Sequence, residues 1–386
     1  AMSSATLERT ALHAPVPLVD LKAEYAAIKD EIDAAIEAVI AQTAFVRGPF
    51  ARRFEAEWAS YCDASHAIGC ANGTAAIELA LEALGVGAGD EVITTPLTFI
   101  ATVEAVVHAG ATPVFADVDA RTGNLSAAAA EAAITARTKA LLPVALYGQP
   151  ADMAEFRSLA ERRKLVLVED AAQAQGASWD GRRTGSDGTA DAVTFSFYPG
   201  KNLGAYGDAG AVTCADATVA DRIMRLADHG RETKYTHDAI GYNARLDGLQ
   251  AAILSAKLGH LEEWNAARRR LAARYDTLLA GAEQDGRLTR VAQAPQAVSS
   301  YHLYVVRVAR RDGLLARLKA ARIEAGVHYP VPLHLQPALA HLGQGRGAFP
   351  AAERLADEAL SLPLFPLMSE AQQDLVVEAL LAALPA

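Results

Sequence analysis

The first half of the chain alternates short apolar runs with stretches of helical spacing. The apolar runs have the length of β-strands, and they cover residues 91–96, 111–117, 139–146 and 165–169. Between them, residues 100–107 and 153–163 place apolar side chains three and four positions apart, as amphipathic helices do. Strands that alternate with helices at this spacing form a mostly parallel sheet with helices on both faces. The sequence therefore predicts an α/β fold.

Two longer stretches are helical throughout. Residues 23–41 have the spacing of an N-terminal helix, and residues 245–280 have the spacing of one long helix that would bridge two domains. The second stretch contains the run Arg268-Arg269-Arg270. We expect these three arginines on a solvated helix face, because runs of like charge are usually exposed.

The pattern after the long helix is mixed. Residues 301–308 alternate like a strand, whereas 314–321 and 352–360 are helical, which suits a small α+β domain. A chain of 386 residues exceeds one ordinary core. We expect a loosely ordered N-terminus at 1–15, a large domain at 16–255 and a small C-terminal domain at 256–386.

Lys201 is the first candidate for chemistry. It stands in the segment 196–204, where a strand-like run ends in a hydroxyl, an aromatic ring, a Pro-Gly turn and the lysine. Such a turn would hold the amine at the mouth of a site, where desolvation lowers its pKa and makes it a nucleophile toward an aldehyde or ketone. An exposed loop lysine is the alternative, and it is the commoner state of a lysine taken alone.

Asp170 closes the apolar run at 165–169 and would lie at the carboxyl end of a buried strand, where open α/β sheets bind ligands. A carboxylate there can keep a pyridine nitrogen protonated. Gln173, one helical turn later, would face the same way and could hydrogen-bond a ring hydroxyl. Asp170 is equally suited to capping a helix that starts after it. Both roles are compatible.

A phosphate site is the third element. Gly73 and Thr74 precede a helical pattern at 77–84, and small residues at a helix start let backbone N–H groups approach a phosphate. Taken alone, the pair also fits an ordinary capped turn. Together with Lys201, Asp170 and a nearby hydroxyl, it supplies what pyridoxal 5′-phosphate (PLP) requires.

With these motifs in order, the chain resembles the DegT/DnrJ/EryC1/StrS family of PLP-dependent sugar aminotransferases from about Pro17 to the C-terminus. The matching segments are 72–74, 169–173, 196–210 and 241–247. The resemblance implies PLP-dependent transferase fold type I, the aspartate-aminotransferase-like fold, with a large mostly parallel sheet domain plus a small α+β C-terminal domain. It also implies a homodimer whose active site is shared across the interface.

The resemblance implies a role for each matching residue. Lys201 would form the Schiff base with the cofactor, and Asp170 would pair with the pyridine nitrogen, so both would be catalytic. Further cofactor contacts would be Gln173 at O3′, Phe99 stacked on the ring, Gly73, Thr74 and Ser196 at the phosphate, and Asn243, which would reach the phosphate from the neighbouring subunit.

Three segments narrow the resemblance. Residues 147–153, the Phe-Tyr-Pro-Gly-Lys form of the lysine loop and residues 328–334 are similar to the subgroup that aminates C3 of nucleotide-linked 3-keto-6-deoxysugars. Several C4 aminotransferases carry a histidine where Tyr198 stands. The resemblance thus implies a dTDP-3-keto-6-deoxyhexose as acceptor, glutamate as donor with 2-oxoglutarate as its product, and substrate contacts from Tyr198, His328, Tyr329 and His334.

Other functions stay open beside this one. A C4 keto-sugar aminotransferase would use the same scaffold. A PLP-dependent 3-dehydratase of the same family would carry a histidine in place of the Schiff-base lysine, so Lys201 argues against it. A PLP-binding regulatory or sensory protein without turnover is compatible with the motifs.

Charge excludes one class of partner. A formal net charge of -10 argues against sequence-independent nucleic-acid binding, which needs a basic surface. A nucleotide sugar is nevertheless anionic, so local basic residues must offset the overall charge. Arg47, Arg231 and Arg245 are the candidates.

The remaining chemistry is sparse. Cys62, Cys70 and Cys214 are unclustered and lack metal-ligand spacing, which suggests reduced thiols in a cytoplasm. No apolar stretch has the length of a membrane span or precedes Pro15 as a signal peptide, so we expect a cytoplasmic protein without membrane contact. The histidines at 328, 334 and 341 lack a matching set of carboxylates, so no metal is expected.

Overall fold

The computed structural model of the protein describes residues 14–385, so nearly all of the expected loose N-terminus, 1–15, lies outside the described residues. The large sheet has seven strands in the order β1-β9-β8-β5-β4-β2-β3. The pairs from β8 to β3 are parallel, and β9 is antiparallel to both β8 and β1. The strands are β1 (His66–Cys70), β2 (Glu91–Thr94), β3 (Thr112–Phe115), β4 (Thr138–Leu142), β5 (Val166–Asp170), β8 (Ala192–Ser196) and β9 (Gly210–Cys214). The prediction of a mostly parallel sheet is confirmed.

Successive strand residues supply two apolar cores, one on each face of this sheet. Leu141 and Leu167 lie in the core formed with α4 (Gly48–Cys62), α7 (Ala127–Ala132) and α8 (Met153–Arg163). Leu142 and Val168 lie in the core formed with α5 (Gly73–Ala83), α6 (Ala101–His108) and α9 (Ala217–Ala227). The strands are buried on both sides, which explains why their sequences read as continuous apolar runs.

Side-chain caps fix where two of the helices begin. The Asp152 carboxylate accepts from Glu155 N at 3.0 Å at the start of α8, and the Asn72 amide oxygen accepts from Ala75 N at 2.8 Å at the start of α5. Both caps satisfy amides that have no partner within the helix. The start of α5 is thereby fixed next to the carboxyl ends of the parallel strands.

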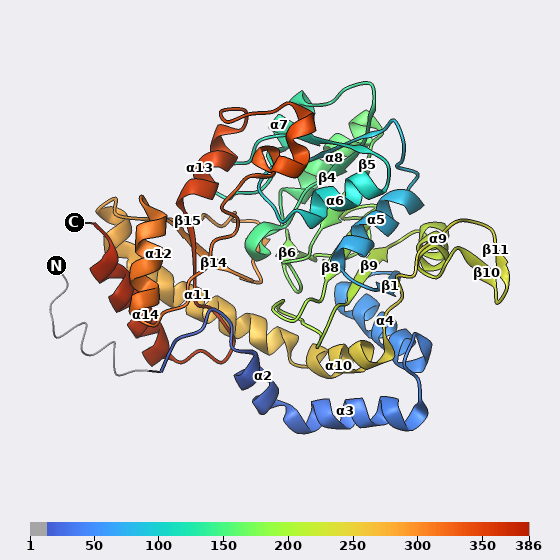
Figure 1. Cartoon of the computed structure of the whole chain (residues 1–386), viewed down its shortest axis with the longest axis horizontal. Helices are drawn as coiled ribbons and strands as arrows, with labels where there is room; N and C mark the ends of the chain where they lie inside the picture. The colour runs from blue at the N-terminus through green and yellow to red at the C-terminus, as the bar shows by residue number, and fades with distance from the viewer. Residues whose placement is uncertain (1–13, 386) are drawn as a thin grey trace.

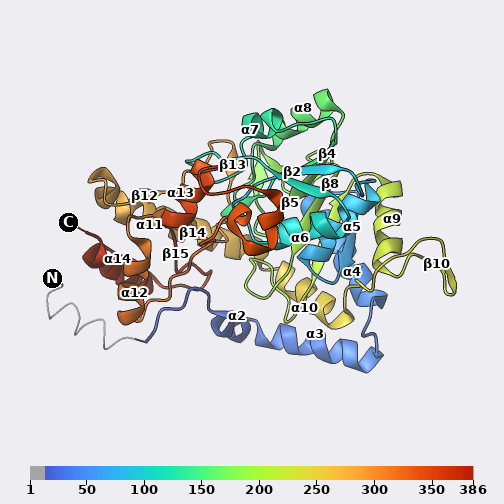
Figure 2. The same ribbon diagram turned by 45° about the horizontal axis from the view of Figure 1, so that its top comes forward.

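The C-terminal part has an apolar core of its own. Tyr275, Val306, Leu318 and Leu380 belong to it. Its elements gather at one end of the molecule, whereas the hairpin of β10 (Arg231–Thr233) and β11 (Thr236–His237) projects at the opposite end (Figures 1 and 2). The elements of this part are α11 (Leu261–Gln284), α12 (Arg311–Ala320), α14 (Glu370–Ala383), β12 (Thr289–Arg290), β14 (Tyr304–Arg307) and β15 (Ala359–Leu362). The helix α13 (Pro350–Glu358) instead shares an apolar cluster with Leu97 and Phe115 of the large part. A division of the chain at residue 255 stays a prediction.

Short elements complete the description. The strands β6 (Ser178–Trp179), β7 (Arg182–Arg183) and β13 (Ala297–Val298) form a small sheet, and the 3-10 helices are η1 (Leu146–Gly148), η2 (Leu333–Leu335) and η3 (Pro337–Leu342). Within residues 14–385, the helices all fall short of the length and apolar character that crossing a membrane requires.

The two long helices of the prediction are each broken once. Residues 23–41 divide into α2 (Leu21–Ala27) and α3 (Lys29–Gln42), because Ile28 has φ -126° and ψ 26°. Residues 245–280 divide into α10 (Gly248–Leu258) and α11 at Gly259 and His260. After the break, α11 runs into the C-terminal part (Figure 1).

The arginine run is a second correction. Arg268 is 2% exposed, and its Nη1 donates to the carbonyls of Tyr301, His302 and Leu364 at 3.3, 3.4 and 2.9 Å. The expectation of a solvated face is therefore wrong for Arg268. The guanidinium is held by backbone carbonyls distant in sequence.

A buried ion pair lies under the lysine loop. Lys257 of α10 is fully buried and pairs with Glu24 of α2. Its Nζ also donates to the carbonyl oxygen of Gly204 at 2.6 Å. The N-terminal helix thus supplies the counter-charge for a cation that supports the segment containing Lys201.

Candidate functional site

A cavity of about 860 Å³ opens where β5 and β8 end and α5 begins. It brings together every catalytic, cofactor-binding and sugar-binding residue predicted from the sequence except Asn243 and His334, and the candidate arginines Arg47, Arg231 and Arg245 also lie outside it. The predicted residues that line the cavity are Gly73, Thr74, Phe99, Asp170, Gln173, Ser196, Tyr198, Lys201, His328 and Tyr329. The sequence motifs therefore converge on one site.

Lys201 faces the cavity from a tight turn. Its N–H donates to Tyr198 O at 2.8 Å, and Ala205 N donates to Phe197 O at 2.7 Å, so the loop is closed by its own backbone. Burial lowers the pKa of Lys201 to about 8, and the nearby Asp170 carboxylate opposes that effect. A substantial share of neutral amine near pH 8 is what a nucleophilic or proton-accepting lysine needs.

Asp170 is buried at the last position of β5. Its Oδ2 accepts from Thr102 Oγ1 at 2.8 Å and its Oδ1 from Ala172 N at 3.1 Å. Residues 171–176 form turns rather than a helix, so the alternative role of Asp170 as a helix cap is wrong. For the same reason, Gln173 is not placed by a helical turn. Burial raises the pKa of Asp170 in spite of these two donors and the charge of Lys201.

The neighbour of Asp170 is a second buried acid. Glu169 is 1% exposed, and burial followed by the charge of Asp170 raises its pKa to about 8. Successive strand residues point to opposite faces, so Glu169 points away from the face on which Asp170 lies. Only Asp170 of the two lines the cavity.

Gly73 and Ser196 meet at the start of α5. A Cβ atom on Gly73 would lie 2.5 Å from the Cβ of Ser196, so the position excludes any side chain. Within residues 14–385, the amides of Gly73 and Thr74 donate no hydrogen bond, and both residues line the cavity. Amides at a helix start with a hydroxyl alongside form a site for a phosphate.

Gln173 connects two segments that border the cavity. Its Oε1 accepts from Tyr147 N at 2.6 Å, and its Nε2 donates to the hydroxyl of Tyr329 at 3.1 Å. Tyr147 donates its own hydroxyl hydrogen to the carbonyl of His328. These bonds fix the orientation of the Gln173 amide and leave one of its N–H groups for a ligand.

Aromatic side chains form the outer part of the site. Phe99 is 56% exposed and Tyr198 is 59% exposed, although both line the cavity. The Phe99 ring lies 5.8 Å from the ring of Tyr329. Exposed rings at a cavity mouth are suited to stacking on a flat ligand.

Asn243 lies outside its own chain's cavity and is exposed. It accepts from Arg245 Nη2 at 2.7 Å. Arg47, Arg231 and Arg245 all approach the Asp228 carboxylate, at 3.5, 3.7 and 3.5 Å. The three arginines proposed from the sequence therefore form one cluster around Asp228, which is the one carboxylate that pairs with them in the described part of the chain.

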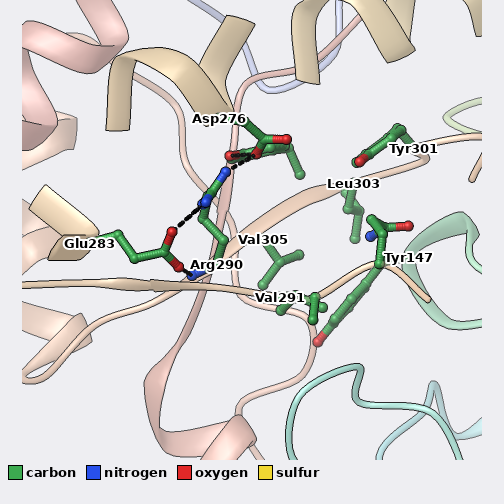
Figure 3. Close-up of a pocket in the computed structure, with 11 residues that line it drawn as sticks. Tyr147, Asp276, Glu283, Arg290, Val291, Tyr301, Leu303 and Val305 are labelled. Carbon is green, nitrogen blue, oxygen red and sulfur yellow. Dashed lines mark hydrogen bonds and ion pairs between the residues drawn. The ribbon is translucent and has the colours of Figure 1, made fainter. Parts of the chain in front are cut away.

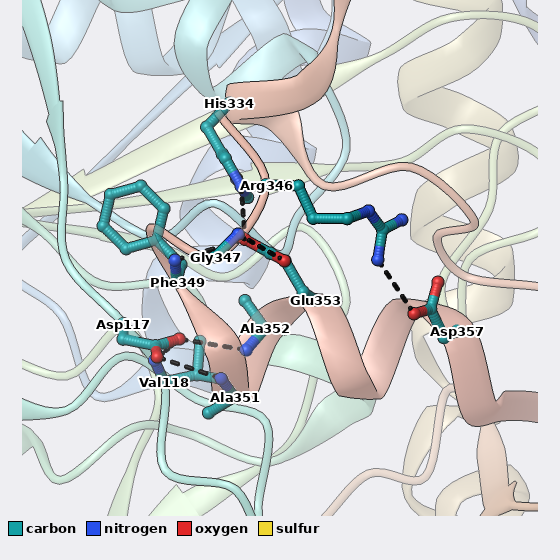
Figure 4. Close-up of polar contacts among 10 residues, drawn as sticks. All are labelled: Asp117, Val118, His334, Arg346, Gly347, Phe349, Ala351, Ala352, Glu353 and Asp357. Atoms are coloured by element: carbon teal, nitrogen blue, oxygen red, sulfur yellow. Dashed lines mark hydrogen bonds and ion pairs between the residues drawn. The ribbon is translucent and has the colours of Figure 1, made fainter. Parts of the chain in front are cut away.

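The structure corrects the expectation for His334. This side chain is buried outside the cavity, and its Nε2 lies 2.9 Å from Glu353 Oε1 (Figure 4). Glu353 also accepts from the amides of Gly347 and Phe349, and the ring of Phe349 packs against His334. The imidazole is enclosed by a loop and α13 and does not line the cavity.

His302 is a cavity residue that the sequence did not single out. It lies one position after Tyr301 in the strand-like segment, and its Nδ1 is 3.2 Å from Asn202 Oδ1. The available signal was its place before β14 in a segment of alternating polarity. Alternating polarity predicts a strand, but it does not show that the residue before this strand borders the cavity.

A second, smaller cavity of about 250 Å³ is lined by Tyr147, Leu303 and Arg290 among others (Figure 3). Arg290 Nη1 lies 2.9 Å from Asp276, and its Nε donates to Glu283 at 2.6 Å. The cation is thus already paired with two carboxylates. Within the described residues, no cluster of His, Cys, Asp and Glu has the arrangement of a metal site.

The family model described as the DegT/DnrJ/EryC1/StrS aminotransferase family matches residues 26–381. The chain belongs to this family. It is 47% identical to a pleiotropic regulatory protein of Geobacillus stearothermophilus over 94% of this chain and 97% of that protein. It is 46% identical to the dTDP-3-amino-3,4,6-trideoxy-alpha-D-glucose transaminase of Streptomyces venezuelae over 94% of this chain and 95% of that enzyme.

The fold is that of the family's solved structures. The crystal structure of S. venezuelae DesV in complex with a ketimine intermediate matches with a TM-score of 0.92 and 45% identity, over 95% of this chain and 98% of that one. The predicted fold class is confirmed. The protein is a PLP-dependent sugar aminotransferase.

The residues present fit the cofactor. Asp170 is buried with neutral hydrogen-bond donors on its oxygens and would gain from a cationic ring nitrogen. Gly73 and Thr74 offer to a phosphate two amides that have no acceptor among residues 14–385. When bound, PLP supplies an electron sink through which an amino group passes from a donor to a ketone. Lys201 Nζ would hold the cofactor and, once released, accept and return a proton, because its lowered pKa favours the neutral amine.

Proposed function

We propose that the enzyme aminates C3 of a nucleotide-linked 3-keto-6-deoxysugar, in the simplest case a dTDP-3-keto-6-deoxyhexose, with glutamate as donor and 2-oxoglutarate as its product. The observation that carries the proposal is Tyr198, exposed in the cavity beside Lys201, at the position where several C4 aminotransferases carry a histidine. The name of the Streptomyces venezuelae relative, a 3-amino sugar transaminase, supports the same position on the ring.

Substrate contacts are assigned to Tyr198, His328 and Tyr329. Burial, and next the charge of Lys201, lower the pKa of His328 to about 4, so its ring is neutral at physiological pH. Its Nδ1 lies 2.8 Å from Ser361 Oγ. A neutral ring and two phenol hydroxyls suit a sugar, which is uncharged and rich in hydroxyl groups.

The proposal includes a homodimer in a cytoplasm. Asn243 is exposed and outside its own cavity, which supports a role at the phosphate of a neighbouring subunit's cofactor. The surplus positive charge of Arg47, Arg231 and Arg245 lies beside Asn243 and suits the diphosphate of a nucleotide sugar. A net charge of -10 makes such a local concentration of arginines necessary for an anionic substrate.

A half-reaction survey tests the substrate. The enzyme is first converted to its pyridoxamine form with glutamate, freed of 2-oxoglutarate, and mixed with 3-keto and 4-keto nucleotide sugars linked to dTDP or UDP. We expect the cofactor spectrum to return fastest with a dTDP-linked 3-keto-6-deoxysugar. A faster return with a 4-keto sugar would establish the C4 alternative.

The same experiment addresses regulation without turnover. One relative is named a regulatory protein, and a protein of that kind would hold the cofactor without exchanging its amino group. A cofactor that glutamate leaves unchanged, at full occupancy, would contradict the proposed donor. Conversion by another amino acid would correct the donor alone.

A further inference from the structure

His302 has its tautomer fixed by a chain of buried amides. Asn265 Nδ2 lies 2.9 Å from the carbonyl oxygen of Gln175, which can only accept, so the atom facing it must be the amide nitrogen. The Asn265 oxygen is then free to accept from Asn202 Nδ2 at 2.8 Å. Asn202 Nδ2 also donates to the carbonyl of Ser300 at 2.8 Å, which fixes the second amide in the same way.

The orientation of Asn202 leaves its oxygen facing His302. Asn202 Oδ1 lies 3.2 Å from His302 Nδ1, and an amide oxygen cannot donate. The hydrogen of the neutral imidazole must therefore reside on Nδ1. It follows that Nε2 carries a lone pair and no hydrogen.

The imidazole stays neutral in this place. Burial lowers the pKa of His302 well below its ordinary value, and the positive charges of Lys201 and Arg268 lower it further. Protonation at Nε2 would put a third cation beside these two. The ring therefore presents a hydrogen-bond acceptor near neutral pH.

The residue that carries this acceptor lines the cavity. His302 lines it together with Lys201, His328 and Tyr329, and within residues 14–385 no donor reaches Nε2. Lys201 experiences the charge of the Asp170 carboxylate, and His328 Nδ1 lies 2.8 Å from Ser361 Oγ. His302 Nε2 is thus an acceptor without a donor among the described residues, next to the neutral side chains of His328 and Tyr329. A ligand hydroxyl group could donate a hydrogen bond to it.

We propose that His302 Nε2 accepts a hydrogen bond from a ring hydroxyl of the bound keto sugar and so selects sugars that carry it. The proposal rests on the proposed function, because only that function supplies a sugar to this cavity. A site built to pair with a hydroxyl rejects an analogue that lacks it far better than an apolar wall does, since the polar group is then left unpaired.

Two substitutions separate the two nitrogens. In His302→Asn the side-chain amide can still donate to Asn202 from the place of Nδ1, but nothing replaces Nε2. In His302→Gln the amide oxygen reaches the place of Nε2, while the bond to Asn202 is lost. A residue that only supports the fold should tolerate asparagine better, whereas an acceptor for the sugar should be replaced better by glutamine.

The rates of the two half-reactions are the measurement, each followed through the cofactor spectrum in the holoenzyme. We expect His302→Asn to slow the sugar half-reaction at least about tenfold more than the glutamate half-reaction, and His302→Gln to recover most of that difference. With wild type, a keto sugar lacking the contacted 2- or 4-hydroxyl should react more slowly, and His302→Asn should no longer distinguish it.

Equal slowing of both half-reactions by His302→Asn would overturn the proposal, because the ring would then act on Lys201 or on the fold. So would a variant that keeps the wild-type preference among the sugars. If either protein fails to fold, the other, together with the deoxy analogues on wild type, still decides. A wild-type enzyme that reacts with glutamate but with no keto sugar would refute the proposed function, a result visible before any variant is made.

Discussion

Replacing Asp170 with asparagine separates the charge of this side chain from its hydrogen bonds. Ala172 N can only donate, so it keeps the oxygen of the new amide on its side, and Nδ2 then faces Thr102. The Thr102 hydroxyl can accept from it, because its hydrogen can turn toward Thr98 Oγ1, 2.9 Å away. Since burial raises the pKa of Asp170, removing the charge relieves a desolvation cost. We expect Asp170→Asn to be as stable as wild type, or more stable, when the cofactor is absent.

The loss should appear in catalysis. A charge-assisted hydrogen bond is worth about 1.5–3 kcal/mol, and opposite charges about 4 Å apart attract by about 4 kcal/mol at an effective dielectric constant of 20. An amide keeps only part of this stabilisation of a protonated ring nitrogen. At about 1.4 kcal/mol per factor of ten, the rate of transamination should fall by about 10- to 1000-fold. The pKa of Lys201 should also fall below about 8, because the opposing carboxylate is gone.

Single-turnover absorbance changes with glutamate, at full cofactor occupancy, measure the effect. Asp208→Asn is the matched control, since Asp208 lines the same cavity but is exposed. It should lose much less activity than Asp170→Asn. Retained catalysis in Asp170→Asn together with a clear drop in its unfolding free energy would mean that the carboxylate serves the fold and not the chemistry.

Three further predictions follow from the site and its surroundings. Lys201→Ala should fold and bind PLP, but it should show neither the Schiff-base absorbance band nor turnover, because alanine offers neither nucleophile nor proton carrier. A Schiff-base band without added amine, or near-normal turnover, would contradict the role of Lys201. Mixing inactive Lys201→Ala with an inactive Asn243→Asp protein should restore activity in a verified heterodimer, because one of its two sites then has both wild-type residues. Absence of rescue would mean that Asn243 does not contribute to the site of the other subunit. Glu169→Gln should flatten the pH dependence of stability: with a folded pKa of about 8, above the ordinary 4.5, Glu169 is protonated in the folded protein and ionised in the unfolded one between these values. Wild type should therefore lose up to about 1.4 kcal/mol per pH unit as the pH rises through that window, and denaturation of both proteins at pH 5.5 and pH 8 measures the difference.

Local sequence signals were sufficient where a helix or strand is determined by its own residues. The prediction of a helix at 153–163 agrees with α8, because the apolar period and the Asp152 cap both lie in the sequence. The breaks at Ile28 and at Gly259 were not predicted, because the apolar pattern continues across both of them. The spacing of apolar residues shows which face of a helix is buried, but it does not show where the helix axis changes direction.

The site residues divide in the same way. Lys201 and Asp170 were found because strand ends and turns in a parallel sheet meet at one edge, whereas Gln173 was found from a helical spacing that the structure does not have. Arg268 and His334 were misplaced because their surroundings come from distant segments: the carbonyls of Tyr301 and Leu364 for the arginine, and Glu353 for the histidine. His302 was missed for the same reason, since the tautomer of its ring is fixed by Asn202 and Asn265, which are distant in sequence.

The ion pair of Lys257 with Glu24 has a consequence for how the chain can be shortened. A truncated protein that begins after residue 24 would leave the Lys257 ammonium buried without its carboxylate, under the Gly204 carbonyl. Removing one member of a buried pair costs about 3–5 kcal/mol. The first helix looks peripheral in Figure 1, yet any minimal catalytic fragment must retain it. A tag or fusion partner should accordingly be joined ahead of α2 and not in exchange for it.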